Sequence, residues 1–596
     1  MHLSSFYQSA LSACDLRIQV IRRKSNILSL LRLLLFSALV YTLYHLIRQF
    51  SPVLLILSVL LAVLFIAGVN YYFRLKDDRA LWEKLRFINA NELGMLKGEA
   101  GGFPDGLAFL DPDNYLDDLD IFGKASLFHT LNRTTTSHGT AALATVLRRS
   151  FLSTADILQQ QVAIKGLAPQ TDVRRLLTAK GLLVGEKEGN LDSLNEWLNM
   201  ESLLYPRIWL RVVIAVLTVF NCWTIYFALA SGNLYPLIAG IVVCRLLTGN
   251  FSKAIGRQHR LISRKQAVLQ QYADILSVFH TADGAGSSLL QRLKTRAGDA
   301  YKAILRLSRL SSYFDQRMNL LVSLAGNSLF FYDLQCLVAL ERWKARYKAE
   351  VPLWVRAVGE IECLNSLATF AFNHPDHVYP SPVEGAAEGG GLFIEATQMA
   401  HPLIPAGRRV ANDFSIGRNE RLILVTGSNM SGKTTFLRTI GVNLLLAQCG
   451  APVCATGFTF TPMQLLTSLR ISDSLQEQTS YFMAELKKLQ RIVHQLQTGT
   501  PALVLIDEIL RGTNSEDKTY GSEQFSRKLT GYTCLSLFAT HDLSLGRLEQ
   551  ELPGVINNYC FESVIEGDNL HFNYQLQRGI ARNRNASFLM KKMDII

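Results

Sequence analysis

Residues 421–438 read RLILVTGSNMSGKTTFLR, and this stretch decides the fold of the second half of the chain. An apolar, strand-like run, LILV, leads directly into Gly427-Ser-Asn-Met-Ser-Gly-Lys-Thr434, which fits the phosphate-binding loop pattern G-x-x-x-x-G-K-[ST]. A helical run, TTFLRTIGVNLLLAQ, follows, so N–H groups of the loop and of the helix N-terminus can surround phosphate. This order predicts a nucleotide-binding α/β domain.

The loop also predicts which residues contact ATP and magnesium. Lys433 is expected to reach the β- and γ-phosphates, and the Thr434 hydroxyl is expected to ligate Mg²⁺. The residues expected to bind ATP along the loop are Gly427, Ser428, Asn429, Met430, Ser431, Gly432, Lys433, Thr434 and Thr435.

Two further apolar runs end in residues that suit ATP hydrolysis. Residues 502–508, ALVLIDE, predict a strand after which Asp507 holds the Mg²⁺ shell and Glu508 polarises the attacking water. Residues 534–542, CLSLFATHD, predict another strand that ends at His541, where a γ-phosphate sensor would lie. An ordinary strand-end histidine is the alternative for His541. The predicted catalytic residues are therefore Lys433, Glu508 and His541, with ATP and Mg²⁺ as the bound groups.

The motifs TGSNMSGKTTFLRTIG, IDEILRGTNSEDKTYG and FATHDL resemble the MutS family of ATPases in their order and spacing. Between them, RISDSLQEQTSYFMAEL resembles the family segment whose serine reaches across a dimer to the partner's γ-phosphate, and Ser480 falls at that position. The resemblance therefore implies a homodimer with composite ATP sites. It also implies that Val410, beside Arg409, and Tyr574 lie against the adenine.

The resemblance extends upstream of the nucleotide motifs. Residues 127–167 resemble the start of the family's helical core, or lever, and include Asn132-Arg-Thr-Thr-Thr-Ser-His-Gly139. Residues 359–371 resemble the end of that lever, and residues 393–412 resemble the run that leads into the ATPase domain. We therefore expect an α/β P-loop NTPase domain of the ABC/MutS type joined to an all-α lever.

The sequence departs from the family pattern in ways that bear on function. About 120 residues precede the lever, and many of them are apolar, so we expect no mismatch-reading domain. The triplet Phe393-Ile-Glu395 is similar to the mismatch-reading wedge, but it falls in an expected strand. Within the ATPase motifs, Ser428 replaces a proline, Ser431 replaces the usual small residue, and Gln478 replaces a glycine. We still expect this domain to bind ATP, and we expect these three substitutions to affect the rate of ATP hydrolysis.

Four apolar segments predict two transmembrane helical hairpins. The first pair covers about 31–47 and 53–72, with a tight turn at Ser51-Pro52, and the second covers about 212–230 and 234–247. A bilayer span needs ~20 apolar residues, which the segment at 53–72 supplies. The segment at 234–247 is the weakest, and a buried helix of a soluble domain is its alternative.

The charges around these segments predict their orientation. Basic residues flank both hairpins at Arg17, Arg22, Arg23, Lys24, Arg74, Lys76, Arg79, Arg207, Arg211, Lys253, Arg257 and Arg260, whereas the turns carry little besides Arg48. By the positive-inside rule, both hairpins enter and leave from the cytoplasm. We therefore expect a multi-pass protein of the cell (inner) membrane with its ATPase on the cytoplasmic side. A hydrophobic content of 49% and a mean hydropathy of +0.15 suit a chain that is part membrane and part soluble.

The positive charge of the chain is concentrated in one region. Residues 245–350 contain seventeen Lys and Arg against seven Asp and Glu, a net of +10 out of +12 for the whole chain. Such a surface suits duplex DNA, bound independently of sequence, or anionic lipid. A solvated helical face with no polyanionic partner is the alternative. The nine cysteines form no C-x-x-C pair, which indicates reduced thiols and no structural metal site.

These observations divide the chain into five regions. In chain order they are an N-terminal segment with the first hairpin (1–90), a first part of the helical core (91–205), the second hairpin (206–250), a basic return of the lever (251–375) and the ATPase domain (376–596).

Three functions fit this organisation. The first is a membrane-anchored MutS-type ATPase dimer whose levers act on DNA, with mismatch repair, the family's role, disfavoured by the missing reading domain. The second is a membrane mechanoenzyme or scaffold that uses the same ATPase without DNA and acts on lipid or a membrane partner. The third, an ABC transporter, is disfavoured because no LSGGQ-like run occurs and Met430 replaces an inner glycine of the loop.

Overall fold

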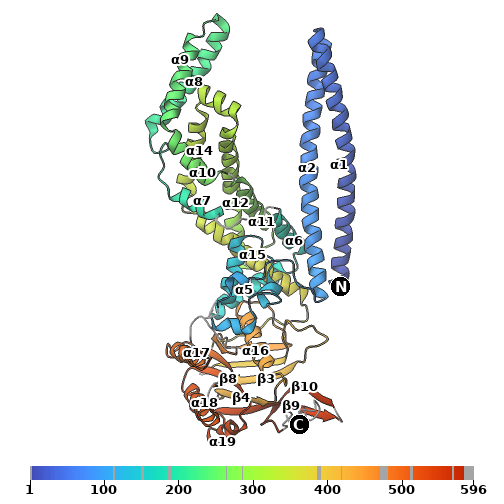
Figure 1. The fold of residues 1–596 in the computed structure, drawn as a ribbon, viewed down its shortest axis with the longest axis vertical. Helices are drawn as coiled ribbons and strands as arrows, with labels where there is room; N and C mark the ends of the chain where they lie inside the picture. Colours follow the sequence, from blue (N-terminus) through green and yellow to red (C-terminus); the bar gives the residue numbers. More distant parts are fainter. Residues whose placement is uncertain are drawn as a thin grey trace.

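In the computed structural model the chain forms two arms, a helical core and an α/β domain (Figure 1). The structure describes residues 3–111, 114–148, 153–183, 190–263, 265–284, 286–384, 391–417, 419–469, 481–510, 514–566 and 569–582. Both arms rise from the same side of the helical core, and the α/β domain lies at the opposite end. The molecule is therefore long, with its predicted nucleotide site far from the arm tips.

The first arm is a hairpin of two long helices, α1 (Leu3–Arg48) and α2 (Pro52–Leu96). The predicted turn at Ser51-Pro52 is confirmed, because α1 ends at Arg48 and Pro52 starts α2, where a proline needs no hydrogen-bonded N–H. The predicted apolar segments form only the outer halves of these helices. The inner halves continue as a stalk that packs on itself and reaches the core, so the boundary predicted at residue 90 falls inside α2.

The second arm is shorter and bent. It consists of α8 (Ile208–Ser231) and α9 (Tyr235–Asn250), joined by a turn in which Gly232 adopts a left-handed φ of 71°. A bend of 62° separates α9 from α10 (Ser252–Ile262). Most side chains of α9 are not buried in a domain core, as Leu246 at 66% exposed illustrates, so the alternative of a buried soluble helix does not describe 234–247.

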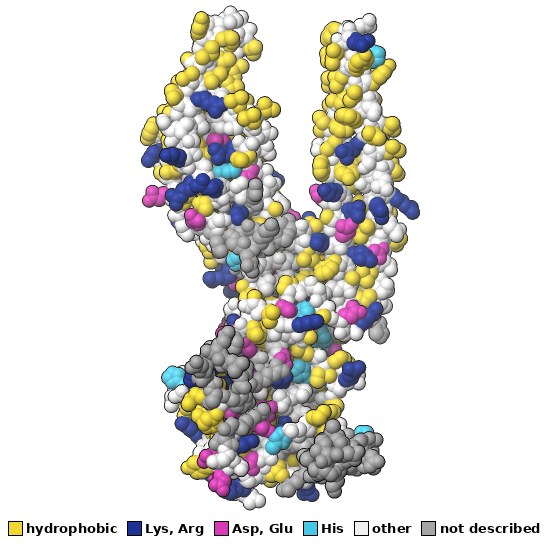
Figure 2. Space-filling view, viewed as in Figure 1, with side chains coloured by type: hydrophobic (Ala, Val, Ile, Leu, Met, Phe, Trp, Pro, Cys, Tyr) yellow, Lys and Arg dark blue, Asp and Glu magenta, His cyan; other side chains and the backbone are white. Residues whose placement is uncertain are grey.

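Several helices are long and apolar enough to cross a membrane. Within the described residues, α1, α2 and α8 meet that criterion singly, and α9 with α10 meets it only as one bent span. Their apolar side chains face outward, as Ile56 of α2 (69% exposed) and Val219 of α8 (70% exposed) illustrate. Figure 2 shows the resulting hydrophobic upper parts of both arms, with Lys and Arg side chains below them.

The helical core combines chain segments from both sides of the second arm. Its main helices are α3 (Leu127–Leu131), α4 (Ser137–Arg148), α5 (Thr154–Leu167), α6 (Thr171–Leu182), α7 (Asn190–Asn199), α10, α11 (Gln266–His280), α12 (Ser288–Asp315), α14 (Tyr332–Tyr347) and α15 (Val351–Asn373). Helix α15 is buried on nearly all sides because α4, α5 and α12 pack around it. Its last residue, Asn373, lies beside the base of the first arm and close to the α/β domain.

The α/β domain contains a six-stranded sheet in the order β10-β9-β4-β8-β7-β6. The strands are β4 (Leu422–Gly427), β6 (Gln464–Ser468), β7 (Ala502–Asp507), β8 (Cys534–Thr540), β9 (Ile556–Glu566) and β10 (Asn569–Arg578), parallel except for the β9–β10 pair. Both faces are covered, so β4 is apolar at consecutive positions. Ile423 belongs to the cluster that includes α16 (Lys433–Gln448), and Leu424 to the cluster with α17 (Tyr481–Leu496) and α18 (Ser515–Thr530).

A smaller mixed sheet lies between the core and the parallel sheet. Its order is β1-β5-β2-β3, with β1 (Ser381–Pro382), β5 (Gly457–Phe460), β2 (Phe393–Met399) and β3 (Asn412–Gly417). The triplet Phe393-Ile394-Glu395 lies in β2, paired with β3 and β5, as the sequence predicts.

Candidate active site

The predicted phosphate-binding loop connects β4 to α16 at the carboxyl edge of the parallel sheet. Gly432 ends the loop with a left-handed φ of 104°, and a Cβ there would lie 3.0 Å from the ring of Tyr574. Only glycine meets both conditions without strain, because L side chains rarely adopt this φ. The loop residues from Asn429 to Thr435 line a cavity of about 700 Å³, a volume that suits a nucleotide.

Lys433 is turned back onto the loop that it follows. Its Nζ donates hydrogen bonds to the carbonyl oxygens of Gly427 and Ser428, each at 2.9 Å, and lies 3.3 Å from Nε2 of His541. The ammonium group is therefore held where a phosphate would bind. Ser431 Oγ is buried and makes no hydrogen bond to any described residue, so it offers a hydroxyl for a ligand within the same loop.

Thr434 and Asp507 form the candidate magnesium site. The Thr434 hydroxyl donates to Oδ2 of Asp507 at 2.5 Å, across the edge between β4 and β7. A hydroxyl and a carboxylate are the hard oxygen donors that Mg²⁺ prefers, usually with phosphate oxygens and water as its other ligands. The two side chains therefore fit the predicted ion. No group of three or more His, Cys, Asp or Glu suited to another metal occurs among the described residues.

Glu508 and His541 lie next to this pair, at the ends of neighbouring strands. His541 Nε2 lies 2.8 Å from Oε1 of Glu508, and Lys518 Nζ lies 4.0 Å from Oε2. Glu508 has a left-handed φ of 48°, and its N–H donates to Ala539 O at 2.9 Å. Such backbone strain in a non-glycine residue is typical of functional sites. His541 contacts both Glu508 and Lys433, and its role as a γ-phosphate sensor stays a prediction.

Two polar residues that the sequence did not single out complete this part of the site. Lys518 of α18 faces Glu508, as described above. Glu485 of α17 is fully buried and accepts a hydrogen bond of 2.6 Å from the N–H of Leu510, two residues after Glu508. Glu485 therefore fixes the backbone two residues after Glu508, and the sequence signal for it was the run SYFMAEL, which contains it.

Val410 and Tyr574, predicted to lie against adenine, line the same cavity. Tyr574 occurs at an irregularity between β9 and β10 and has a left-handed φ of 54°. Asn412 fixes this geometry, because its Nδ2 donates to Tyr574 O at 3.0 Å and its Oδ1 accepts from Leu576 N at 2.7 Å. Asn412 is a positioning residue that sequence reasoning missed. Its place two residues after Val410 was the only signal that pointed to it.

His401 also lines this cavity. Burial, together with the nearby charge of Arg438, lowers the pKa of His401 to about 4. The imidazole is therefore neutral at physiological pH and adds no positive charge to this cavity. The predicted cross-dimer residue Ser480 and the substituted Gln478 lie outside the described residues.

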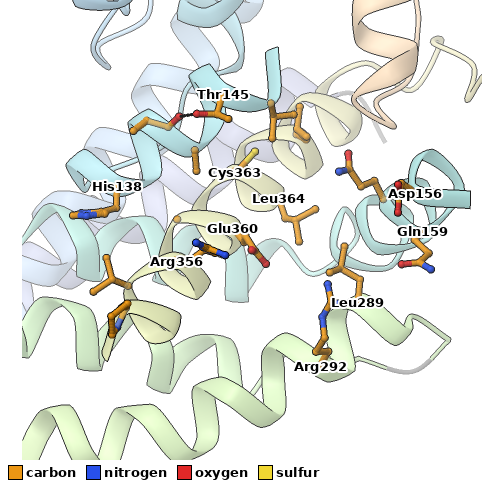
Figure 3. A pocket seen from close by; sticks show the side chains of 18 of the residues that line it. His138, Thr145, Asp156, Gln159, Leu289, Arg292, Arg356, Glu360, Cys363 and Leu364 are labelled. Atoms are coloured by element: carbon orange, nitrogen blue, oxygen red, sulfur yellow. Dashed lines mark hydrogen bonds between the residues drawn. The ribbon is translucent and has the colours of Figure 1, made fainter. Parts of the chain in front are cut away.

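A second cavity, of about 720 Å³, lies in the helical core and was not predicted (Figure 3). Arg356 and Glu360 of α15 and Arg292 of α12 project towards it, and Asp156 of α5 lies on its far side. Charges of both signs face this cavity, and none of these residues belongs to the nucleotide motifs.

The converging loop, lysine, carboxylates and histidine define the class of this domain, which is a P-loop ATPase domain. Comparison of the sequence with models of known protein families makes this class more specific. Residues 423–591 match the family model described as MutS domain V. The chain therefore carries a MutS-family ATPase domain at the end where the sequence motifs predict it.

Three similar proteins illustrate the extent of the likeness. The DNA mismatch repair protein MutS of Chlorobium phaeovibrioides is 32% identical over 234 residues, which is 38% of this chain and 26% of that protein. That of Thermotoga maritima is 30% identical over 221 residues, 37% of this chain and 27% of that protein. The human MutS protein homolog 4 is 30% identical over 198 residues, which is 33% of this chain and 20% of that protein. The chain thus matches about a quarter of the length of these relatives.

Proposed function

We propose that this chain is a membrane-anchored ATPase of the MutS type, in which ATP binding and hydrolysis close and reopen a homodimer and move its helical levers. One observation carries the proposal. Lys433 and Thr434 at the start of α16 meet Asp507, Glu508 and His541 from the ends of two strands at one edge of the parallel sheet.

Each of these side chains suits one part of phosphoryl transfer to water. Bound Mg²⁺, held by Thr434 and Asp507, would neutralise charge on the phosphate oxygens. Lys433 would exchange its loop carbonyls for the β- and γ-phosphates. Glu508 would orient the attacking water and accept its proton, and His541, which lies between Glu508 and Lys433, would donate a hydrogen bond to the γ-phosphate.

The homodimer rests on the MutS resemblance, in which Ser480 acts in the partner's site. Helix α17 follows that segment directly, and its Lys488 lies 2.6 Å from Asp118. Asp118 is buried and also accepts from Leu469 N at 2.7 Å. Because Asp118 lies just before the helical core, this contact would transmit dimer closure from α17 to the lever.

The arms suit insertion from the cytoplasmic side. Their apolar side chains face outward, whereas Arg17, Lys24 and Arg74 gather around one small cavity on the inner, core-side half of the first arm. By the positive-inside rule this half stays on the cytoplasmic side, together with the ATPase domain. Closure of the ATPase domains would then move levers that are fixed to the inner membrane.

For the lever's partner we propose duplex DNA, bound independently of sequence. The relatives from Chlorobium and Thermotoga are named DNA mismatch repair proteins. The basic region of the present chain also exposes Arg292, Lys302 and Arg309 along α12. Contacts from such residues would go to phosphates, so binding would weaken steeply with salt.

The second candidate is action on the membrane itself. Some basic residues of the region 245–350 lie close to the second arm, which favours this function. Arg306 of α12 and Arg342 of α14 line a crevice at the base of α8. In this function the levers would transmit ATP-driven closure to the hairpins or to a membrane partner.

The experiment that separates these functions is ATP hydrolysis by the detergent-purified full chain. The assay is run without DNA and with perfectly paired, mismatched and single-stranded DNA, at two salt concentrations, and again with phosphatidylglycerol vesicles. Lys433→Ala serves as the blank because it removes the phosphate-binding ammonium group.

Stimulation by duplex DNA that falls with salt would support DNA as the partner. A preference for mismatched DNA would restore the mismatch-repair role that the sequence disfavours. A rate that ignores every DNA and rises with vesicles would favour the membrane candidate. No hydrolysis above the Lys433→Ala blank under any condition would contradict the proposal as a whole.

A further inference from the structure

A crevice of about 560 Å³ lies at the base of the second arm, between α8, α12 and α14. Four arginines line it, namely Arg211 of α8, Arg306 of α12, and Arg342 and Arg346 of α14. Within the described part of the chain, no acidic residue belongs to its lining. Four guanidinium groups around one crevice repel one another, so the arrangement favours a bound anion.

Two of these arginines lie over aromatic rings. The guanidinium of Arg211 lies 4.8 Å from the ring centre of Tyr205, and that of Arg346 lies 5.3 Å from the ring centre of Tyr347. Nε of Arg211 is buried and makes no hydrogen bond to any described residue. A buried N–H of a charged group that lacks an acceptor is costly, and a phosphate oxygen would satisfy it.

The remaining wall of the crevice is apolar and leads towards the arm tip. Ile214 and Ala215 of α8 face Val338 and Ala339 of α14, one or more helical turns beyond the arginines. At the far end, Gln335 Nε2 donates to Thr218 Oγ1 at 3.3 Å. The crevice therefore has a cationic mouth and an apolar wall on the side of the arm tip, and farther along α8 apolar side chains such as Val219 are exposed.

Nearby side chains extend this surface. The segment between α12 and α14 exposes Met318, Leu320 and Leu321, each more than 70% exposed. Figure 2 shows the hydrophobic part of this arm above a group of Lys and Arg side chains. A free anion would use the cationic mouth and leave the apolar wall in water, whereas a phospholipid would cover both.

We propose that this crevice binds an anionic glycerophospholipid, with its phosphate among the four arginines and an acyl chain along α8. The inference rests on the membrane insertion of the arms under the proposed function. Basic pockets between helices at the cytoplasmic surface are suited to such head groups. The bound lipid would join α8 to α12 and α14, and so fasten the second arm to the lever.

The test compares two variants of the full chain that lose the same charge. Arg342→Gln/Arg346→Gln removes two arginines of the crevice, whereas Arg309→Gln/Lys348→Gln removes two exposed cations of α12 and the end of α14 that do not line it. Each protein is reconstituted into phosphatidylcholine nanodiscs with a minority of phosphatidylglycerol. The lipid that stays bound after detergent extraction is then counted by native mass spectrometry.

We expect the wild type and the control to retain phosphatidylglycerol in preference to phosphatidylcholine. The crevice variant should lose this preference by about ten-fold or more, since a cation near an anionic head group contributes about 1 kcal/mol. Equal retention by all three proteins, or equal loss in both variants, would overturn the proposal. Displacement of the retained lipid by millimolar inorganic phosphate would show a phosphate site instead and would also overturn it.

Membrane insertion is measured separately, by alkaline carbonate extraction of membranes that contain the wild type. Extraction into the soluble fraction would contradict the membrane part of the proposed function. Resistance to extraction, together with a failed lipid preference, would contradict the crevice proposal alone.

Discussion

The two ends of this molecule use polar and apolar residues in opposite ways. At the ATPase end, polar side chains such as Thr434, Asp507 and Glu508 converge on one cavity, and apolar strands are buried behind them. At the arm end, apolar side chains face outward, and a buried polar network lies where the first arm meets the core. One end therefore gathers polar groups around a cavity, whereas the other exposes apolar side chains along its helices.

The first arm is joined to the core through a buried polar network. Arg133 forms a two-pronged ion pair with Glu92 of α2, and Asn373 Nδ2 donates to the same carboxylate at 2.7 Å. Tyr7 of α1 donates to Asn373 Oδ1 at 2.6 Å. Because α15 ends at Asn373 and the chain continues from there into the α/β domain, this network links the first arm to the helix that leads to the ATPase end.

The largest expected effect isolates the ATPase end. Glu508→Gln removes the proposed water-orienting carboxylate, and hydrolysis should fall by about 10²- to 10⁴-fold, the usual contribution of a general base. ATP binding should persist, because Lys433 and Thr434 are unchanged. Steady-state hydrolysis and equilibrium binding of fluorescent ATP measure the two quantities. A variant that hydrolyses ATP at the wild-type rate would remove Glu508 from the catalytic role.

The next effect concerns the link between the ends. Arg133→Met leaves the buried Glu92 carboxylate without its partner, which should cost about 3–5 kcal/mol of stability. The double variant Glu92→Met/Arg133→Met removes both charges and should recover much of that loss. The apparent thermal unfolding of the detergent-solubilised chain reports the stability of the three proteins. A double variant as unstable as the single one would show that the ion pair is not the source of the loss.

A smaller effect depends on pH at the junction of core and ATPase domain. Burial, with the charges of His374 and Arg409 adding to it, lowers the pKa of His377 to about 3, and neither ring nitrogen has a hydrogen-bond partner among the described residues. The unfolded chain takes up a proton at this histidine near pH 6.5, whereas the folded chain does not. Stability from this group is therefore complete above pH 6.5 and is lost as the pH falls towards 3.

His377→Phe should remove that part of the acid sensitivity. At pH 5 protonation of His377 in the unfolded chain should have lowered the free energy of unfolding of the wild type by about 2 kcal/mol. This follows from about 1.36 kcal/mol for each pH unit below 6.5. At pH 8 the two proteins should be of similar stability, because the histidine is neutral in both states. Thermal unfolding between pH 5 and pH 8 provides the comparison, and parallel pH profiles for the two proteins would contradict the assignment.

The smallest effect returns to the ATPase end. Asn412→Ala removes both hydrogen bonds that hold the backbone around Tyr574, at about 1 kcal/mol each. The KM for ATP should rise several-fold while kcat changes little, since the phosphate side is untouched. Asn412→Asp keeps the acceptor for Leu576 N and should show a smaller rise in KM. An unchanged KM in Asn412→Ala would mean that Tyr574 is positioned by other contacts.

The sequence alone predicted the residues of the ATP cavity that lie within contiguous motifs. The loop from Gly427 to Thr435, the Asp507-Glu508 pair and His541 each follow an apolar strand, and parallel strands place such ends at one edge. Asn412, Glu485 and Lys518 were not predicted, because their partners lie outside their own stretches of sequence. These partners are Tyr574, Leu510 and Glu508, respectively. The roles assigned to the predicted residues stay predictions until the variants are measured.

The arms show the same division. Composition predicted the apolar segments and the turn at Ser51-Pro52, since a run of apolar residues and a proline act locally. It did not predict that α1 and α2 continue as a stalk to the core, because stalk residues such as Arg86 and Asp15 become partners only when the hairpin folds.

The sequence is therefore sufficient to predict the chemistry of short stretches, namely a phosphate loop, two carboxylates after a strand, and apolar helices with basic ends. Which distant residues share one site depends on the folded chain. Arg211, Arg306, Arg342 and Arg346 come from three helices and form one crevice, and Glu92 of the first arm meets Arg133 of the lever. Local signals follow from backbone geometry and side-chain type, whereas these contacts depend on how helices pack, which no single stretch encodes.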